Sequence, residues 1–196
     1  MTVILDYGMG NLRSVQQALR AVGCSASVQP NLAGATRLII PGVGAFGAAM
    51  ERLSPLVHDI RRAARDGMPI LGLCLGQQLL FESSEERGSF AGLGLLEGRV
   101  KYLQPAPRVK IPHIGWNSLH YLRDEGPTAG GREGEQVYFV HSLVTLCDHG
   151  SDVVATSHHG VEFTAAVGRG NVWGCQFHPE KSGEVGLRML RRFVAC

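Results

Sequence analysis

The feature that most constrains the fold is a short apolar segment that runs directly into a helical pattern, with a cysteine at the joint. Residues 70–73 (Ile-Leu-Gly-Leu) follow a proline and indicate a buried strand, and residues 75–82 show the mixed apolar and polar pattern of a helix. Cys74 therefore stands on the turn between them, in the pattern G-x-C-x-G. The flanking Gly72 and Gly76 leave room for a tight turn, because neither carries a Cβ.

A thiol at this joint is well placed for chemistry. Unpaired backbone N–H groups at the start of a helix favour an anion, and the thiolate is the nucleophilic form of cysteine. The same pattern with serine forms the strand-to-helix elbow of a class of hydrolases. The alternative is a buried structural cysteine, because free cysteine is among the most buried residue types. On these residues alone the two interpretations have about equal weight.

The order of the predicted elements indicates an α/β fold. Up to residue 82 it is strand, helix, strand, strand, helix, strand, helix, as in a doubly wound sheet. The second half carries short strands without intervening helices and ends in a helix over 184–195. We expect a mostly parallel central sheet with flanking helices and additional short strands in the C-terminal half. Residues 83–98 are polar and rich in glycine. Residues 123–134 are expected to be a polar loop and a mobile surface segment, and residues 1–196 are expected to form one domain.

Composition and charge limit the classes of function. The chain has 196 residues, enough for a sizeable core, and its net charge of +2 is interspersed, so charge gives no argument for nucleic acid or an anionic membrane as a partner. The apolar runs are too short to span a bilayer, and no signal peptide is visible. The five cysteines lack C-x-x-C or zinc spacing, so a reduced, cytoplasmic compartment is expected rather than a disulfide framework.

A second polar constellation follows the predicted strand at 172–177. His178 precedes Pro179, and a residue before proline is held in an extended conformation. Residues two apart in an extended segment point the same way, so Glu180 can accept a hydrogen bond from the His178 ring. Such a pair is the base and its orienting group in a catalytic triad. The alternative is a turn with an exposed histidine and glutamate. Cys74 also follows a predicted strand, and a parallel sheet can bring the two loops together.

Two glycine-containing loops also follow predicted strands. Residues 41–44 (Pro-Gly-Val-Gly) come after the strand at 37–40, and residues 8–11 (Gly-Met-Gly-Asn) come after the strand at 2–6. The glycines at 41–44 can form a simple turn, or they can equally let backbone N–H groups approach a ligand at the carboxyl end of a strand. The loop at 8–11 lacks the third glycine of a dinucleotide-binding turn, so we interpret it as a tight strand-to-helix connection.

Several segments resemble the class I glutamine amidotransferases. The general resemblance rests on G-L-C-L-G-Q-Q and Q-F-H-P-E, which in that family carry a Cys-His-Glu triad. More narrowly, the chain is similar to the glutaminase subunits of imidazole glycerol phosphate synthases, which act in histidine biosynthesis. The segments that carry this narrower resemblance span nearly the whole chain: 6–15 (DYGMGNLRSV), 41–46 (PGVGAF), 72–82 (GLCLGQQLLFE), 111–117 (IPHIGWN), 138–142 (YFVHS) and 176–182 (QFHPEKS).

The resemblance implies hydrolysis of glutamine to glutamate and ammonia. Cys74 would attack the side-chain amide carbon, and His178 would take the thiol proton and return it to the departing ammonia. Glu180 would hold His178, and water would then hydrolyse the thioester. Oxyanion stabilisation needs preorganised N–H donors, and by the family pattern these are the backbone N–H groups of Val43 and Leu75.

Two further residues match substrate-binding positions of the family. Gln78 corresponds to a glutamine that contacts the substrate, and Ser142 lies in the segment that holds its amino-acid end. The family usually has an aromatic residue after this serine, whereas this chain has Leu143. Because that contact tends to be made through the backbone, a small effect is expected. His113 and His141 are expected to be structural.

The resemblance also implies a partner, a (β/α)8-barrel cyclase that receives the ammonia in a heterodimer. Asn11, Trp116 and Lys181 match family positions near that interface. Taken alone, they would be interpreted as a helix cap, a core residue and a solvated charge. No metal or other cofactor is implied. The isolated subunit is expected to be weakly active, because the loop that carries Val43 needs the partner to turn that N–H group towards the site.

Three alternatives remain open at this point. The chain can be the glutaminase subunit of another pathway, such as pyridoxal phosphate or anthranilate synthesis, although segments 6–11 and 111–117 argue against it. It can be a silent subunit that only stabilises its partner, although the intact Cys, His and Glu argue against that. It can also be a cysteine hydrolase with another substrate.

Overall fold

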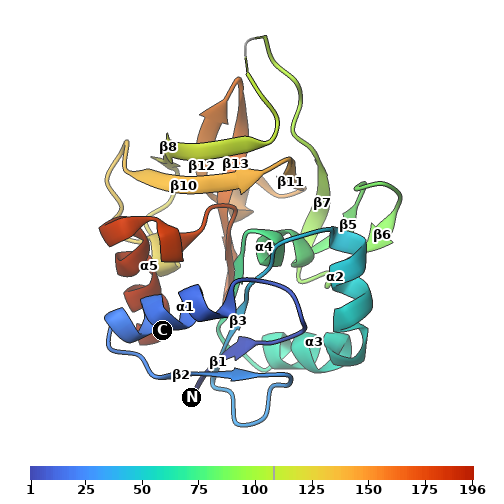
Figure 1. The fold of residues 1–196 in the computed structure, drawn as a ribbon, viewed down its shortest axis with the longest axis vertical. Helices are drawn as coiled ribbons and strands as arrows, with labels where there is room; N and C mark the ends of the chain where they lie inside the picture. Colours follow the sequence, from blue (N-terminus) through green and yellow to red (C-terminus); the bar gives the residue numbers. More distant parts are fainter. Residues whose placement is uncertain (108) are drawn as a thin grey trace.

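The computed structural model describes residues 1–107 and 109–196 as a sheet with helices on both faces and a smaller β layer above it (Figure 1). The α-helices of the described residues are α1 (Leu12–Ala21), α2 (Phe46–Leu53), α3 (Val57–Arg65), α4 (Leu75–Leu79) and α5 (Gly183–Ala195). The short 3-10 turns are η1 (Ser54–Leu56), η2 (Gly126–Thr128), η3 (Gly150–Asp152) and η4 (Pro179–Lys181).

The strands fall into a large sheet and two smaller ones. The large sheet contains β1 (Thr2–Leu5), β2 (Ala26–Gln29), β3 (Arg37–Ile40), β4 (Ile70–Leu73), β9 (His120–Tyr121), β12 (Val153–His159), β13 (Val161–Arg169) and β14 (Val172–Cys175). The second sheet contains β5 (Phe81–Ser84), β6 (Phe90–Ala91), β7 (Leu96–Tyr102) and β11 (Leu143–Cys147). The third pairs β8 (His113–Ser118) with β10 (Gln136–His141).

The strand order of the large sheet places the candidate residues at one edge. The order is β2-β1-β3-β4-β14-β13-β12-β9, and the strands from β2 to β14 run parallel. Strand β4 pairs with β3 on one side and with β14 on the other, so Ile70 lies level with both Leu38 and Val172. The carboxyl ends of parallel neighbours meet at the same edge. The loops after these three strands therefore meet there.

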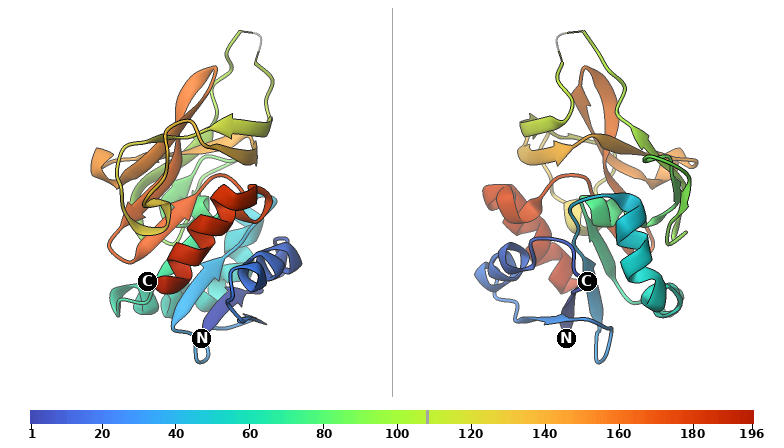
Figure 2. Two further views of the ribbon diagram at one scale, coloured as in Figure 1. Left: turned by 90° about the vertical axis from the view of Figure 1, so that its left-hand side faces the viewer. Right: turned by 45° about the vertical axis from the view of Figure 1, so that its right-hand side comes forward.

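The core has one layer on each face of the large sheet. All of β1 is buried, and its side chains alternate: Ile4 packs in the layer under α1 and α5, whereas Val3 and Leu5 pack in the layer under α2 and α3. Helix α1 forms because Val15 and Leu19 recur at helical spacing on its buried face. Figure 2 shows α1 and α5 on one side of the sheet and α2 and α3 on the other.

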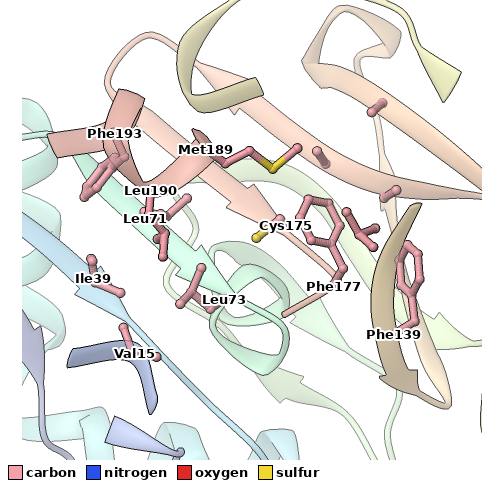
Figure 3. Close-up of a cluster of buried hydrophobic side chains, with 14 of the residues drawn as sticks. Val15, Ile39, Leu71, Leu73, Phe139, Cys175, Phe177, Met189, Leu190 and Phe193 are labelled. Carbon is pink, nitrogen blue, oxygen red and sulfur yellow. The ribbon is translucent and has the colours of Figure 1, made fainter. Parts of the chain in front are cut away.

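The layer under α5 continues to the small β layer (Figure 3). Phe193 and Leu190 of α5 lie near Leu71 of β4. Phe177, just after β14, packs edge-on against Phe139 of β10, with ring centroids 5.8 Å apart. Both rings are fully buried. This contact fixes the chain immediately before His178.

The helix expected in the middle of the chain was wrong in part. The helix expected over 75–82 ends at Leu79, and β5 begins at Phe81. Leu79, Leu80 and Phe81 are all fully buried, so the apolar run fits either element by pattern alone. Residues 83–98, which are polar and rich in glycine, contain the end of β5, β6 and the start of β7, to which the sequence assigned no element. Pairing between strands decided these elements, and a local pattern does not show that pairing.

The segment at 123–134 was expected to be a mobile excursion, and this is wrong for its centre. The turn η2 packs against α5, and Pro127 and Thr128 are buried. A Cβ on Gly126 would overlap the ring of Trp173, so the turn lies directly on that side chain. Within residues 1–107 and 109–196, no helix is long and apolar enough to cross a membrane.

Candidate functional site

Cys74 occupies the expected elbow between β4 and α4. Its backbone has φ 54° and ψ −108°, a conformation that side-chain-bearing residues rarely adopt. The two flanking glycines are required by close packing. A Cβ on Gly72 would lie 2.5 Å from the carbonyl oxygen of Gly76, and a Cβ on Gly76 would overlap the carbonyl oxygen of Ile40. The turn is therefore held from both sides, with the Cys74 side chain largely buried.

His178 and Glu180 form a buried hydrogen-bonded pair. Nδ1 of His178 lies 2.8 Å from Oε1 of Glu180, and their side chains are only 5% and 2% exposed. The expected hydrogen bond is confirmed, and the alternative of an exposed histidine and glutamate is wrong. The expected extended segment is wrong beyond His178, because Pro179–Lys181 form the 3-10 turn η4. The His178 backbone is fixed as well, because its N–H donates to the carbonyl of Tyr138 and its carbonyl accepts from the Ser182 hydroxyl.

The electrostatics of His178 favour its charged form. Burial opposes the charge, but the sulfur of Cys74 and the carboxylate of Glu180 outweigh burial and raise the pKa of His178 to about 9. Nδ1 faces a carboxylate, so it carries the proton in the neutral ring. Nε2 is buried without an aligned hydrogen-bond partner among the described residues. Cys74 therefore raises the pKa of His178 because its sulfur lies close to the ring, and Nε2 can exchange a proton with that sulfur.

The loop after β3 lies against the start of α4. A Cβ on Gly42 would come within 2.9 Å of the Leu75 Cβ and 3.1 Å of the Gly76 nitrogen, so the two backbones are in close contact. The hydroxyl of Tyr7 donates to the carbonyl of Pro41 at 2.6 Å and holds this loop. Val43 and Leu75 thus lie on adjoining segments beside Cys74, and Val43 is half-exposed. Their role as oxyanion donors stays a prediction.

Gln78 and Ser142 also lie near the elbow. The Gln78 side chain is buried, and its Nε2 donates to the carbonyl of Leu143 at 3.4 Å and to Oε1 of Gln176 at 2.9 Å. Ser142 joins β10 to β11, and its carbonyl accepts from the backbone N–H of Leu103. The amide nitrogen of Gln78 therefore already has protein partners, and its contact with a substrate stays a prediction.

Two residues beside Cys74 were not assigned a role from the sequence. Gln176 is fully buried, and its Nε2 lies 3.6 Å from the Cys74 sulfur. Tyr7 is also buried, and burial first and the charge of Cys74 second raise the pKa of its phenol. A signal for Gln176 was present, since it is a polar residue between the apolar strand 172–175 and Phe177. Tyr7 carried no such signal.

His113 and His141 form a buried hydrogen-bonded pair. Nδ1 of His113 lies 3.0 Å from Nε2 of His141, and Nδ1 of His141 donates to the carbonyl of Leu143 at 2.8 Å. Burial, reinforced by neighbouring histidines, lowers the pKa of His113 to about 3 and that of His141 to about 4. Both rings are therefore neutral near pH 7. In the described part of the chain, no three His, Cys, Asp or Glu side chains gather as metal ligands would.

The residues expected near a partner are exposed. Trp116 stands on β8 with 55% of its surface exposed, so its interpretation as a core residue is wrong. It meets the ring of Tyr138 edge-on at 6.1 Å, and Nζ of Lys181 lies 5.7 Å above the same ring. Asn11 caps α1 by accepting from the backbone N–H of Ser14. A role for these residues in an interface stays a prediction.

Comparisons with known proteins identify the family and the fold of this chain. The profile of the glutamine amidotransferase class-I family matches residues 3–196. Imidazole glycerol phosphate synthase subunit HisH of Geobacillus thermodenitrificans is 47% identical over 203 residues, covering 99% of this chain and 95% of that protein. The subunit of the same name from Aquifex aeolicus is 48% identical over 198 residues, covering 98% and 95%. A solved structure of PurLQS from Thermotoga maritima superimposes with a TM-score of 0.76 at 23% identity, covering 99% and 97%.

Proposed function

Because this chain belongs to the class I glutamine amidotransferases, we propose that Cys74, His178 and Glu180 are the triad that hydrolyses the side-chain amide of glutamine. One observation carries the proposal. Nε2 of His178 is buried beside the Cys74 sulfur with no aligned partner among residues 1–107 and 109–196, while Nδ1 is held by Glu180. This is the arrangement of a base that is oriented by a carboxylate and faces a nucleophile.

The reaction follows from the positions of these groups. The Cys74 thiolate attacks the amide carbon, and the negative charge that develops on the amide oxygen is stabilised by the backbone N–H groups of Leu75 and Val43. Protonated His178 gives its Nε2 proton to the departing ammonia, which leaves a γ-glutamyl thioester. His178 then removes a proton from water, which attacks the thioester, and glutamate and the free cysteine are released. Glu180 stabilises the charge on His178 throughout.

The curated relatives are named as subunits of a larger enzyme. The chain is the glutaminase subunit of an imidazole glycerol phosphate synthase and acts in histidine biosynthesis. A subunit implies a partner. We infer that the partner is a (β/α)8-barrel cyclase, which receives the ammonia and forms imidazole glycerol phosphate and an aminoimidazole carboxamide ribotide. The complex is a heterodimer in the cytoplasm.

The face of β8 and β10 that points away from the core supports a docking site for this partner. Ile114 and Trp116 lie two positions apart on β8 and so share one face, and they are 60% and 55% exposed. Val140 lies level with Ile114 on β10, and Tyr138 lies level with Trp116. Lys181 adds a charge at its edge. A central aromatic residue with a polar rim is typical of an interface. The carbonyl of Val140 lies 3.8 Å from the Cys74 sulfur, so the same strand also borders the nucleophile.

Regulation by the partner rests on Val43. Its loop is half-exposed, in contrast to the buried start of α4 that carries Leu75. A partner that contacts this loop can favour the state in which the Val43 N–H points at the site, which is a population shift. The isolated subunit is therefore expected to hydrolyse glutamine only weakly.

Release of glutamate from glutamine tests the proposed function. The assay compares this chain alone, with the cyclase, and with the cyclase plus its nucleotide ligand, and it repeats each condition with Cys74→Ser. A large rise in the full mixture that Cys74→Ser abolishes is the expected result. Full activity of the subunit alone would contradict the gating by Val43 but not the triad. A parental rate in Cys74→Ser would contradict the triad itself.

A further inference from the structure

Gln176 is placed against the reacting sulfur by the fold. It follows β14 directly, and its backbone N–H donates to the carbonyl of Ala165 at 2.8 Å, which continues the pairing with β13. The side chain is fully buried, and its Nε2 lies 3.6 Å from the Cys74 sulfur. A buried amide group in this position must satisfy its hydrogen bonds within the protein, because an unpaired one is costly. Its orientation is therefore determined by its neighbours.

The hydrogen-bond network fixes which end of the amide faces the sulfur. A backbone carbonyl can only accept, so Gln78 must turn its Nε2 to the carbonyl of Leu143. The second hydrogen of the same nitrogen then points at Gln176, which must present Oε1. The Nε2 of Gln176 is left facing Cys74. The orientation of the Gln176 amide is therefore set by the Leu143 carbonyl through Gln78.

The Leu143 carbonyl, on which this network depends, also accepts a hydrogen bond from a series of histidine side chains whose donors are all fixed in direction. Nδ1 of His141 donates to the carbonyl of Leu143, so Nε2 of His141 must accept, and it faces the Nδ1–H of His113. The Nδ2 of Asn117 lies 3.4 Å from the remaining His113 nitrogen. Each donor in this series has one possible direction while the two histidines are neutral. The amide of Gln176 therefore has no low-energy flipped state.

We propose that Gln176 is a further catalytic residue of this site, whose Nε2–H group donates a hydrogen bond to the sulfur of Cys74. The proposal rests on the proposed function in that Cys74 is the nucleophile. The bond stabilises the thiolate before attack, and it stabilises the same thiolate again when it leaves the thioester. In the thiol form the sulfur can instead donate to the carbonyl of Val140. When the Cys74 thiol ionises, it loses its weak hydrogen bond to the Val140 carbonyl, and the thiolate accepts a hydrogen bond from the Gln176 N–H group.

A neighbouring residue provides a matched control. Gln77 is also a fully buried glutamine, one position before Gln78 on α4, but its Nε2 donates to the hydroxyl of Thr145 at 3.2 Å. It therefore resembles Gln176 in residue type and burial and differs in its partner. Gln77→Met and Gln176→Met remove the same chemical group from similar surroundings. Gln176→Glu is a sharper change, because it keeps the side-chain shape and the acceptor for Gln78, removes the N–H donor and places a negative charge beside the sulfur.

The test is the rate at which Cys74 of the full chain is alkylated by iodoacetamide as a function of pH. The modified peptide is followed by mass spectrometry, which separates Cys74 from the other cysteines. In Gln176→Met the rate at pH 7 is expected to fall about tenfold, with the midpoint of the pH profile raised by about one unit, since a hydrogen bond to a charged group has this magnitude. Gln176→Glu is expected to lower the rate further. Gln77→Met is expected to keep the parental rate and midpoint.

The outcomes separate this proposal from the proposed function, because alkylation requires no glutamine and no partner. Parental alkylation in Gln176→Met would overturn the proposal even if glutamine hydrolysis is lost. An equal fall in Gln77→Met and Gln176→Met would also overturn it, since burial alone would then explain the effect. A fall confined to the Gln176 variants supports it, whether or not the parental chain releases glutamate. Thermal melts of each variant show that the folded protein is compared.

Discussion

Replacing Gly72 by alanine tests the close packing that creates the elbow. Gly72 lies in the middle of the large sheet, and its backbone conformation is open to any residue, so only space forbids a side chain. A Cβ there would lie 2.5 Å from the oxygen of Gly76 and 2.7 Å from the nitrogen of Gln77, both in the first turn of α4. That turn must move by at least 0.5 Å to reach the 3.0 Å below which Cβ contacts essentially never occur (3.0 − 2.5 Å).

The expected cost follows from this displacement. Overpacking of a well-packed site costs about 1–3 kcal/mol. About 2 kcal/mol corresponds to a fall in Tm of roughly 4–8 °C for a domain of this size. Because the turn carries Cys74 and the N–H of Leu75, activity is expected to fall as well. A misplacement of about 1 Å can cost about 100-fold in rate, so a loss of roughly 10-fold to 100-fold is expected.

Two assays are needed. Stability is measured by urea unfolding monitored by circular dichroism, and activity is measured as glutamate release in the presence of the partner. Gly150→Ala is the matched control, because Gly150 is exposed, has nothing within 4 Å of its Cβ position and does not adopt a positive φ. It is expected to be neutral, or to stabilise the protein by up to about 1 kcal/mol. If Gly72→Ala matched Gly150→Ala in stability and activity, the argument that packing of the first turn shapes the elbow would be refuted.

Three further predictions concern the site and its surroundings. Glu180→Gln is expected to lower kcat by about 100-fold to 10,000-fold and to lower the pKa of His178 from about 9, as seen in the pH dependence of kcat; an unchanged profile would contradict the role of Glu180. His141 has a pKa of about 4 in the folded protein and about 6.5 in the unfolded chain. The free energy of unfolding is therefore expected to fall by up to about 1.4 kcal/mol per pH unit as the pH falls from 6.5 to 4. The urea midpoints at pH 7 and pH 5 should differ less in His141→Phe than in the parental protein. Trp116→Ala is expected to weaken binding of the cyclase at least tenfold, measured by calorimetry, with unchanged alkylation of Cys74; equal affinity would remove Trp116 from the interface.

The parts of the fold that local patterns determine were predicted from the sequence. Strands β1, β3 and β4 are largely apolar, and α1 and α5 carry apolar residues at helical spacing. The elbow was predicted because two glycines flank Cys74 at the junction of a strand and a helix. Strands β5 and β6 were not predicted, because β5 pairs with both β6 and β7, and the residue pattern of each short segment alone does not show that pairing.

The candidate site shows the same division. The extended backbone of His178 followed from the proline after it, which is a local constraint, whereas the 3-10 turn η4 that brings Glu180 to the His178 ring was not predicted. The contact of Gln176 with Cys74 depends on β14 lying beside β4 in register, so that Cys175 is level with Leu73. No local pattern carries that register. The exposure of Trp116 was likewise not predictable from its residue type, since tryptophan is usually largely buried.

The central claim is that Cys74 forms a covalent intermediate with glutamine. The most direct test is to mix the assembled synthase with glutamine, quench the reaction rapidly in acid and examine the peptides by mass spectrometry. A γ-glutamyl thioester on Cys74 is expected to appear during turnover and to be absent in Cys74→Ser. Release of glutamate at the parental rate without any adduct on Cys74, or by Cys74→Ser, would contradict it.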